Sequence, residues 1–203
     1  MHDAVIEEWR PGHAGESRLG AELDMLAEVL RAVVYAGASV SFVTPFAPGE
    51  ARAFWLDQVL PDVRRGTRRV LTARIDGEIV GTVQLNLDVP PNQRHRAEVI
   101  KLLVHPKARR QGIGRALMLA VEQVAKSEGR TLLTLDTRRG DAAEPLYLTM
   151  GFVLAGVIPR YARGPLLPDL EDTSIMYKEI AGADGAGRCQ PAGAETPVTD
   201  RPR

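Results

Sequence analysis

Two glycines within a run of basic residues form the stretch of this sequence best suited to chemistry. Residues 109–116 read Arg-Arg-Gln-Gly-Ile-Gly-Arg-Ala and follow an apolar segment. Downstream, apolar residues recur with the spacing of one helix face, at Ile113, Leu117, Ala120, Val121 and Val124. A loop at a helix N-terminus presents backbone N–H groups without intrahelical partners, and the helix dipole there favours negative charge. Because Arg109, Arg110 and Arg115 add guanidinium groups, the segment predicts a phosphate-binding site.

The spacing distinguishes among three kinds of phosphate-binding loop. A P-loop ends in Gly-Lys-Ser/Thr, whereas Arg115-Ala116 follows the second glycine here. A dinucleotide-binding loop needs a small residue three positions after the second glycine, where Leu117 stands. The remaining pattern, Arg/Gln-x-x-Gly-x-Gly/Ala, resembles the pyrophosphate loop of the GNAT N-acetyltransferases and is matched by Arg109, Gly112 and Gly114. An ordinary strand-to-helix turn with two glycines is the alternative interpretation.

A second segment extends this resemblance. Residues 143–152 read Ala-Glu-Pro-Leu-Tyr-Leu-Thr-Met-Gly-Phe, which is similar to the GNAT motif in which a tyrosine precedes a Gly-Phe pair. The resemblance implies that Tyr147 lies near the sulfur of coenzyme A. Many members carry a coenzyme-contacting asparagine seven positions before this tyrosine, where this chain has Gly140. That departure, together with Asp136-Thr137 on the preceding segment, resembles the tabtoxin-resistance acetyltransferase branch.

The resemblance implies an N-acetyltransferase with acetyl-CoA as co-substrate. We expect the coenzyme to contact the strand and loop around the glycines, at Leu102, Leu103, Val104, Arg109, Arg110, Gln111, Gly112, Ile113, Gly114 and Arg115. The expected acceptor is a primary amine of a small molecule, such as an amino-acid-like toxin or antibiotic, which attacks directly in a ternary complex. A peptide or protein amine is the alternative acceptor. A non-catalytic acyl-CoA-binding module is the alternative of another class. No His, Cys and carboxylate cluster has metal-ligand spacing, so no metal is expected.

Direct transfer to an amine requires removal of a proton, since free aliphatic amines have a pKa near ~10. Glu98 resembles the general-base glutamate of the histone-type members, and a charged strand end is its alternative interpretation. Asp136 resembles the catalytic aspartate of the tabtoxin-resistance branch, and a capping role is its alternative. Tyr147 is the candidate general acid toward the departing thiolate, or else a core aromatic residue. By family analogy, Tyr161 and Arg163 are expected to line the acceptor pocket.

Length and composition predict one cytoplasmic domain followed by a tail. The 203 residues carry 26 basic and 26 acidic side chains, which argues against nucleic acid or an anionic membrane as main partner. No apolar run approaches the roughly 20 residues that span a bilayer, and the first residues lack the apolar core of a secretory signal. Residues 1–180 are expected to form the acetyltransferase domain, and residues 181–203 a disordered tail rich in Ala, Gly and Pro. Because the only cysteine, Cys189, lies in that tail, no thiol nucleophile is expected in the fold.

Hydrophobic patterning predicts a mixed α/β fold. The expected elements are a strand at 5–9, helices at 19–34 and after 48, a hairpin around Asp76-Gly77, a strand at 98–104, a helix from 113, and strands near 132–137, 152–158 and 174–180. Strands that first form hairpins and then alternate with helices predict a mixed sheet of about six or seven strands flanked by helices. The resemblance implies a single GNAT-like domain, with the coenzyme held where the middle strands separate. The protein is expected to be a monomer or a homodimer.

Overall fold

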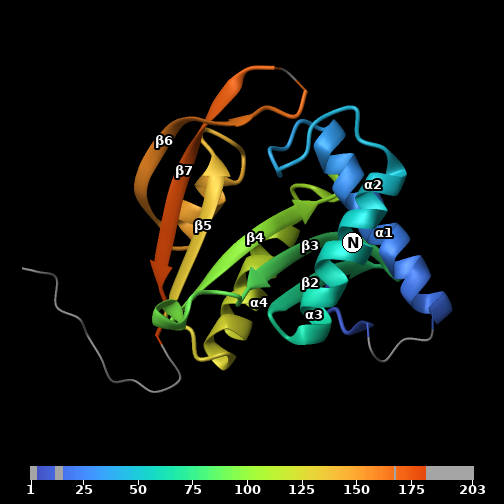
Figure 1. Ribbon diagram of the computed structural model, residues 1–203, viewed down its shortest axis with the longest axis horizontal. Helices are drawn as coiled ribbons and strands as arrows, with labels where there is room; N and C mark the ends of the chain where they lie inside the picture. The colour runs from blue at the N-terminus through green and yellow to red at the C-terminus, as the bar shows by residue number, and fades with distance from the viewer. Residues whose placement is uncertain (1–3, 12–15, 167, 182–203) are drawn as a thin grey trace, which may run out of the picture.

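Seven strands form one mixed sheet with helices on both of its faces (Figure 1). The computed structural model describes residues 4–11, 16–166 and 168–181. Within the sheet the strand order is β1-β2-β3-β4-β5-β7-β6, and the β4/β5 pair is parallel while the other pairs are antiparallel. The strands are β1 (Val5–Glu8), β2 (Arg68–Ile75), β3 (Glu78–Asn86), β4 (Arg96–Val104), β5 (Leu132–Arg138), β6 (Val153–Arg163) and β7 (Leu170–Glu179). The predicted mixed α/β fold is therefore confirmed.

The helices connect and cover these strands. They are α1 (Glu16–Tyr35), α2 (Pro48–Ala53), the π-helical η2 (Phe54–Val59), α3 (Leu60–Arg65), the 3₁₀ turns η3 (Pro91–Gln93) and η4 (Pro106–Ala108), α4 (Ile113–Ser127) and α5 (Glu144–Thr149). In the parts of the chain that the structure describes, no helix is long and apolar enough to cross a membrane. The tail predicted for residues 181–203 lies, from residue 182 on, outside the described residues.

Each face of the sheet buries its own core. Leu26 and Leu30 of α1 and Trp55 of η2 belong to the core on one face, whereas Leu117 of α4 belongs to the core on the opposite face. Side chains alternate along a strand, so neighbouring strand residues enter different cores. In β2, for example, Val70 packs under α1 and Leu71 packs under α4. This two-sided burial fixes the strands that carry the functional side chains.

The turn between β2 and β3 follows from its sequence. Asp76 has a φ of 50° and Gly77 a φ of 86°. Two successive positive φ angles give a hairpin turn whose twist matches that of the flanking strands, and Asp-Gly is well suited to adopt them. The hairpin predicted at this dipeptide is thus present.

The strands β4 and β5 pair over only three residues and then diverge. Their register is Arg96 with Leu132, Ala97 with Leu133 and Glu98 with Thr134. Beyond Glu98, β4 keeps only its β3 partner and β5 keeps only its β7 partner. The middle strands therefore separate, as the resemblance implied, and the gap widens toward their carboxyl ends (Figure 1). Backbone groups of β4 that face this gap have no strand partner.

A β-bulge interrupts β4 at Lys101. The register pairs Thr82 with Leu103 and Gln84 with Ile100, so two residues of β4 stand opposite one residue of β3. Lys101 adopts a φ of 53° there. In an uninterrupted strand Val99 and Leu103 would share a face, but Val99 packs under α4 and Leu103 under α1. The bulge, which the sequence analysis did not predict, turns Lys101 toward the α1 side.

The last two strands are longer than predicted. The ladder continues through Ala162 with Glu171 and Arg163 with Leu170, after a register shift between Ile158 and Ala162. That irregularity disrupts the alternation of side chains, so the patterning indicated a loop in this part of the chain. Tyr161 consequently lies within β6 and is exposed.

Candidate active site

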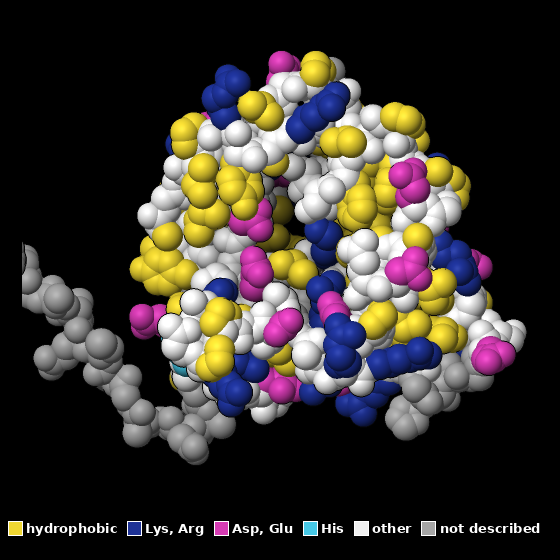
Figure 2. Space-filling view, in the orientation of Figure 1, with side chains coloured by type: hydrophobic (Ala, Val, Ile, Leu, Met, Phe, Trp, Pro, Cys, Tyr) yellow, Lys and Arg dark blue, Asp and Glu magenta, His cyan; other side chains and the backbone are white. Residues whose placement is uncertain are grey.

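A cavity of about 700 Å³ lies in the gap between β4 and β5. Its walls come from these strands, from α5, from residues 108–115 around the start of α4, and from the loop 36–41 after α1. Figure 2 shows the hollow in the middle of this face, with acidic side chains toward β5 and basic side chains toward the opposite side. All three predicted catalytic residues, Glu98, Asp136 and Tyr147, line this cavity.

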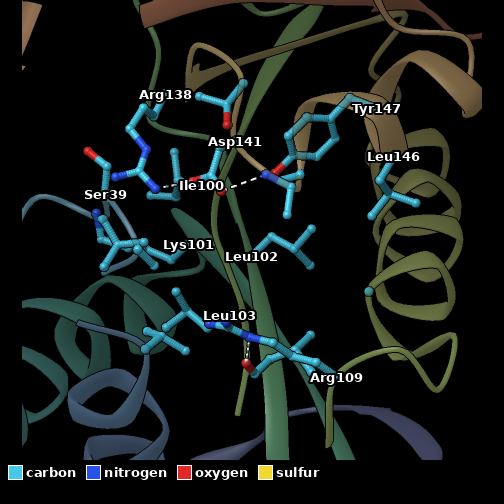
Figure 3. A pocket seen from close by; sticks show the side chains of 18 of the residues that line it. Ser39, Ile100, Lys101, Leu102, Leu103, Arg109, Arg138, Asp141, Leu146 and Tyr147 are labelled. Atoms are coloured by element: carbon cyan, nitrogen blue, oxygen red, sulfur yellow. Dashed lines mark hydrogen bonds and ion pairs between the residues drawn. The ribbon is translucent and has the colours of Figure 1, made fainter. Parts of the chain in front are cut away.

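The basic loop lies at one end of the cavity. Gly112 precedes α4 with a φ of 80°, a conformation that favours glycine, and a Cβ there would meet no described atom within 4 Å. Arg109, Arg110 and Arg115 are exposed, and no described residue gives any of them a carboxylate partner. Arg109 Nε instead donates to the Val104 carbonyl oxygen at 3.3 Å (Figure 3). The N–H groups of the first helical turn and the guanidinium groups are thus available to an anion.

Some predicted ligand-contacting residues lie elsewhere. Gln111 does not line this cavity; it lines a separate one formed with α1 and the turn between β2 and β3. Leu103 lines the cavity, but its side chain is 1% exposed and packs under α1, so its backbone is the part that a ligand can reach. Tyr161 and Arg163, which were expected at the acceptor pocket, are exposed in β6, and neither lines this cavity.

Tyr147 extends from α5 into the cavity (Figure 3). Its side chain is 6% exposed, and its ring lies 5.8 Å from that of Phe152, centroid to centroid. Burial, with smaller contributions from Asp141 and Asp136, raises the pKa of Tyr147 above its usual value. No described residue forms a hydrogen bond with its hydroxyl. The hydroxyl therefore stays protonated and can donate to a group bound in the cavity.

The loop before α5 is fixed by Glu144. This carboxylate accepts hydrogen bonds from the Ser174 hydroxyl at 2.7 Å and from the Gly140 N–H at 2.6 Å. These two bonds, the Ser174 hydroxyl first, hold the pKa of Glu144 below its usual value. Gly140 has a φ of 74°, a conformation that favours glycine. Glu144 thus ties the start of α5 to β7 and positions Tyr147.

The two carboxylates line the same cavity as Tyr147. Glu98 is the last β4 residue that pairs with β5, so it stands where the gap begins. Asp136 is exposed on β5, two residues beyond Thr134, the partner of Glu98. No described residue forms a hydrogen bond or an ion pair with either side-chain carboxylate. Asp136 lies within β5 and forms no capping hydrogen bond with a described residue, which argues against the capping alternative.

Lys101 is a cavity residue that the sequence analysis missed. Its Nζ donates to Ser41 Oγ at 3.0 Å and lies 5.8 Å from the centre of the Phe42 ring. Burial lowers the pKa of Lys101, and the nearby charge of Asp136 opposes this shift most strongly. Asp136 thus acts electrostatically on both Lys101 and Tyr147. The sequence signal that could have revealed it is a single lysine within the otherwise apolar run 99–104.

Arg138 is a second cavity residue that was missed. Figure 3 shows it beside Asp141, with which it pairs at 3.3 Å. It also pairs with Glu171 of β7 at 3.1 Å. These contacts join the end of β5 to the loop before α5 and to β7. Because both partners are carboxylates, they neutralise the charge of Arg138 at the edge of the cavity.

The loop after α1, of which residues 36–41 line the cavity, contacts the connection between β6 and β7. The backbone N–H and the hydroxyl of Thr44 both donate to the Pro165 carbonyl oxygen at 2.9 Å. A Cβ on Gly37 would lie 3.4 Å from Leu166, so these loops are in close contact. The loop after α1 is therefore held against the β6–β7 connection.

Comparison with known proteins identifies the family of this domain. The profile of the Acetyltransferase (GNAT) family matches residues 34–152. The chain belongs to the GNAT family of acetyltransferases. As a member it is an acetyl-CoA-dependent acyltransferase, which confirms the enzyme class and the co-substrate predicted from the sequence. Among the described residues, no group of His, Cys, Asp and Glu is placed to hold a metal ion.

The similarity extends to individual proteins. An uncharacterized N-acetyltransferase of Azospirillum brasilense is 32% identical over 127 residues, which cover 61% of this chain and 73% of that protein. N-acetyltransferase 8 of Rattus norvegicus is 38% identical over 86 residues, but the chain spans only 39% of that protein. The solved structure of yncA from Salmonella typhimurium with its cofactor acetyl-CoA has a TM-score of 0.69 at 17% identity, covering 92% of this chain and 99% of that one. At this identity the structural match shows the shared fold.

Proposed function

We propose that this acetyltransferase moves the acetyl group of acetyl-CoA to a primary amine of a small molecule, as in the tabtoxin-resistance branch, while both substrates are bound. The observation that carries the proposal is a single cavity that joins the basic loop at α4, Tyr147, and the carboxylates Glu98 and Asp136. A thioester held there lies between a donor for its leaving sulfur and an acceptor for the proton of the amine.

In this proposal the coenzyme occupies the basic loop and the free side of β4. Its pyrophosphate accepts hydrogen bonds from N–H groups at the start of α4 and is neutralised by Arg109, Arg110 and Arg115. The extended pantetheine arm pairs with β4 beyond Glu98, on the edge where β4 no longer has β5 as a partner. Unpaired N–H groups near the bulge at Lys101 are also suitable donors for the oxyanion that forms on the thioester carbonyl.

Proton transfer is divided between the two sides of the thioester. On the acceptor side, Asp136 or Glu98 takes the amine proton directly or through water. On the coenzyme side, Tyr147 gives a proton to the departing thiolate. The described lining contains no cysteine or histidine, and Ser41 accepts a hydrogen bond from Lys101. These features support direct attack by the amine over an acyl-enzyme intermediate.

The experiment that tests this proposal is an acceptor panel that follows thiol release from acetyl-CoA. The panel contains primary amines, free amino acids and short peptides with free N-termini. We expect release with a subset of the small amines and little release with the peptides. Release only with peptides or proteins would refute the small-molecule acceptor, and no release with any amine, despite coenzyme binding, would refute amine transfer.

Amide replacements identify the base. If Asp136 is the base, Asp136→Asn should lower the rate by about 10²-fold at low pH, where the free amine is scarcest. Raising the pH should partly restore this variant, because more of the amine is then already neutral. Glu98→Gln should show the same behaviour if Glu98 serves instead, and Asp24→Asn on the exposed surface of α1 is the matched control. Full activity in both cavity variants at every pH would mean that bulk water takes the proton.

A further inference from the structure

The cations at the acceptor end differ in whether a carboxylate neutralises them. Arg138 pairs with Asp141 and Glu171, as described above. Arg68, behind the cavity on β2, pairs with Asp62 at 2.7 Å. Lys101 has a hydroxyl and an aromatic ring beside its Nζ, and no described residue gives it an ion-pair partner. Lys101 is also partly buried, and Asp136 and Glu98 attract its charge without forming an ion pair with it, so an anion entering the cavity would meet an ammonium group with no carboxylate in contact.

Asp136 is a negatively charged residue that lines the same cavity from β5, whereas Lys101 lines it from β4. Its carboxylate lines the cavity from β5, is exposed, and has no hydrogen bond or ion pair with a described residue. The cavity therefore carries the ammonium group of Lys101 on β4 and two carboxylates, Glu98 on β4 and Asp136 on β5, none of which forms an ion pair with a described residue. A ligand that carries both charges in one small molecule would satisfy both kinds of group.

We propose that the acceptor is a free amino acid or a close analogue, with its amine at Asp136 and its carboxylate bound by Lys101 and the Ser41 hydroxyl. This inference rests on the proposed function and specifies the substrate class of the same site. A peptide N-terminus or a protein lysine lacks a carboxylate close to its reacting amine and leaves Lys101 without an ion-pair partner. The subsite therefore selects free amino acids over peptides.

The local structure holds Lys101 ready for this role. The bulge fixes its backbone and turns its side chain toward the α1 side, where Ser41 and Phe42 contact its ammonium group. The same loop is held by the bonds from Thr44 to Pro165. A cation that is positioned before the ligand arrives loses little side-chain freedom on binding.

The test compares each amino acid with its carboxamide and with the corresponding decarboxylated amine. For accepted amino acids, kcat/KM should exceed that of the carboxamide by about tenfold or more, as expected for a hydrogen bond to a charged group. Lys101→Gln should remove this preference by raising KM for the amino acid while leaving kcat/KM for the carboxamide within about twofold. Lys101→Arg should restore part of the preference, and Lys107→Gln on the exposed turn η4 is the matched control.

Binding measurements keep the inference testable if turnover is low. Calorimetric titration of the coenzyme A complex with the same amino acids should show binding that weakens by about tenfold or more in Lys101→Gln. Melting temperature and acetyl-CoA affinity should be unchanged in that variant. Equal use of acid and carboxamide, equal losses for both in Lys101→Gln, or neither binding nor acetylation of any amino acid would overturn the inference. If other amines were still acetylated, the proposed function would survive.

Discussion

Replacement of Tyr147 by phenylalanine is expected to lower turnover by about 10²-fold or more, with little change in acetyl-CoA affinity. The ring and its contact with Phe152 remain, so packing is preserved, but the donor to the departing thiolate is lost. Burial keeps the pKa of Tyr147 above its usual value, so in the native protein this donor stays protonated across the working pH range. Raising the pH should not restore Tyr147→Phe, because the missing step is proton donation to sulfur.

The matched control for this change is Tyr177→Phe on β7, a tyrosine that does not line the cavity. Turnover of this control should stay within about twofold of the native protein. Steady-state kinetics with acetyl-CoA and the preferred amine provide the comparison. A turnover in Tyr147→Phe equal to that of the control would show that water or another group protonates the thiolate.

Gly112→Asp is expected to abolish acetyl-CoA binding. The new carboxylate would stand beside the site of the pyrophosphate, where it would oppose the helix dipole and the surrounding arginines. The positive φ of Gly112 adds backbone strain, so a control with equal strain is required.

Gly129→Asp supplies that control. Gly129 follows the other end of α4 with a φ of 69°, and a Cβ there also meets no described atom within 4 Å. It should lose similar stability but keep its affinity for acetyl-CoA in calorimetric titration. Unchanged affinity in a folded Gly112→Asp variant would refute the assignment of the coenzyme loop.

The proposed coenzyme half of the site could be recognised in the sequence because its information is local. The loop around Gly112 and the helix that follows it are contiguous in the sequence. The spacing of their glycines and apolar residues therefore indicates the backbone conformation directly. Tyr147 and its Gly-Phe pair are likewise a short motif. The hairpin at Asp76-Gly77 was predictable for the same reason, since two residues determine the turn.

The acceptor half could not be predicted in this way because it depends on contacts between distant segments. Lys101 would acquire its proposed role from a bulge in β4 and from Ser41, which lies 60 residues earlier in the chain. The predicted strand had no bulge, and without one the direction of Lys101 could not be read from the alternation of side chains. Tyr161 was expected in a loop, but β6 continues through it after a register irregularity that the sequence does not reveal.

The most direct test of the central claim is a crystal structure of the acetyl-CoA complex. The claim is that the gap between β4 and β5 holds the coenzyme with its thioester at Tyr147. Pyrophosphate oxygens should lie about 2.7–3.2 Å from N–H groups at the start of α4, and the sulfur should lie within reach of the Tyr147 hydroxyl. A coenzyme bound outside this gap, or bound in the loop with its sulfur far from Tyr147, would contradict the account.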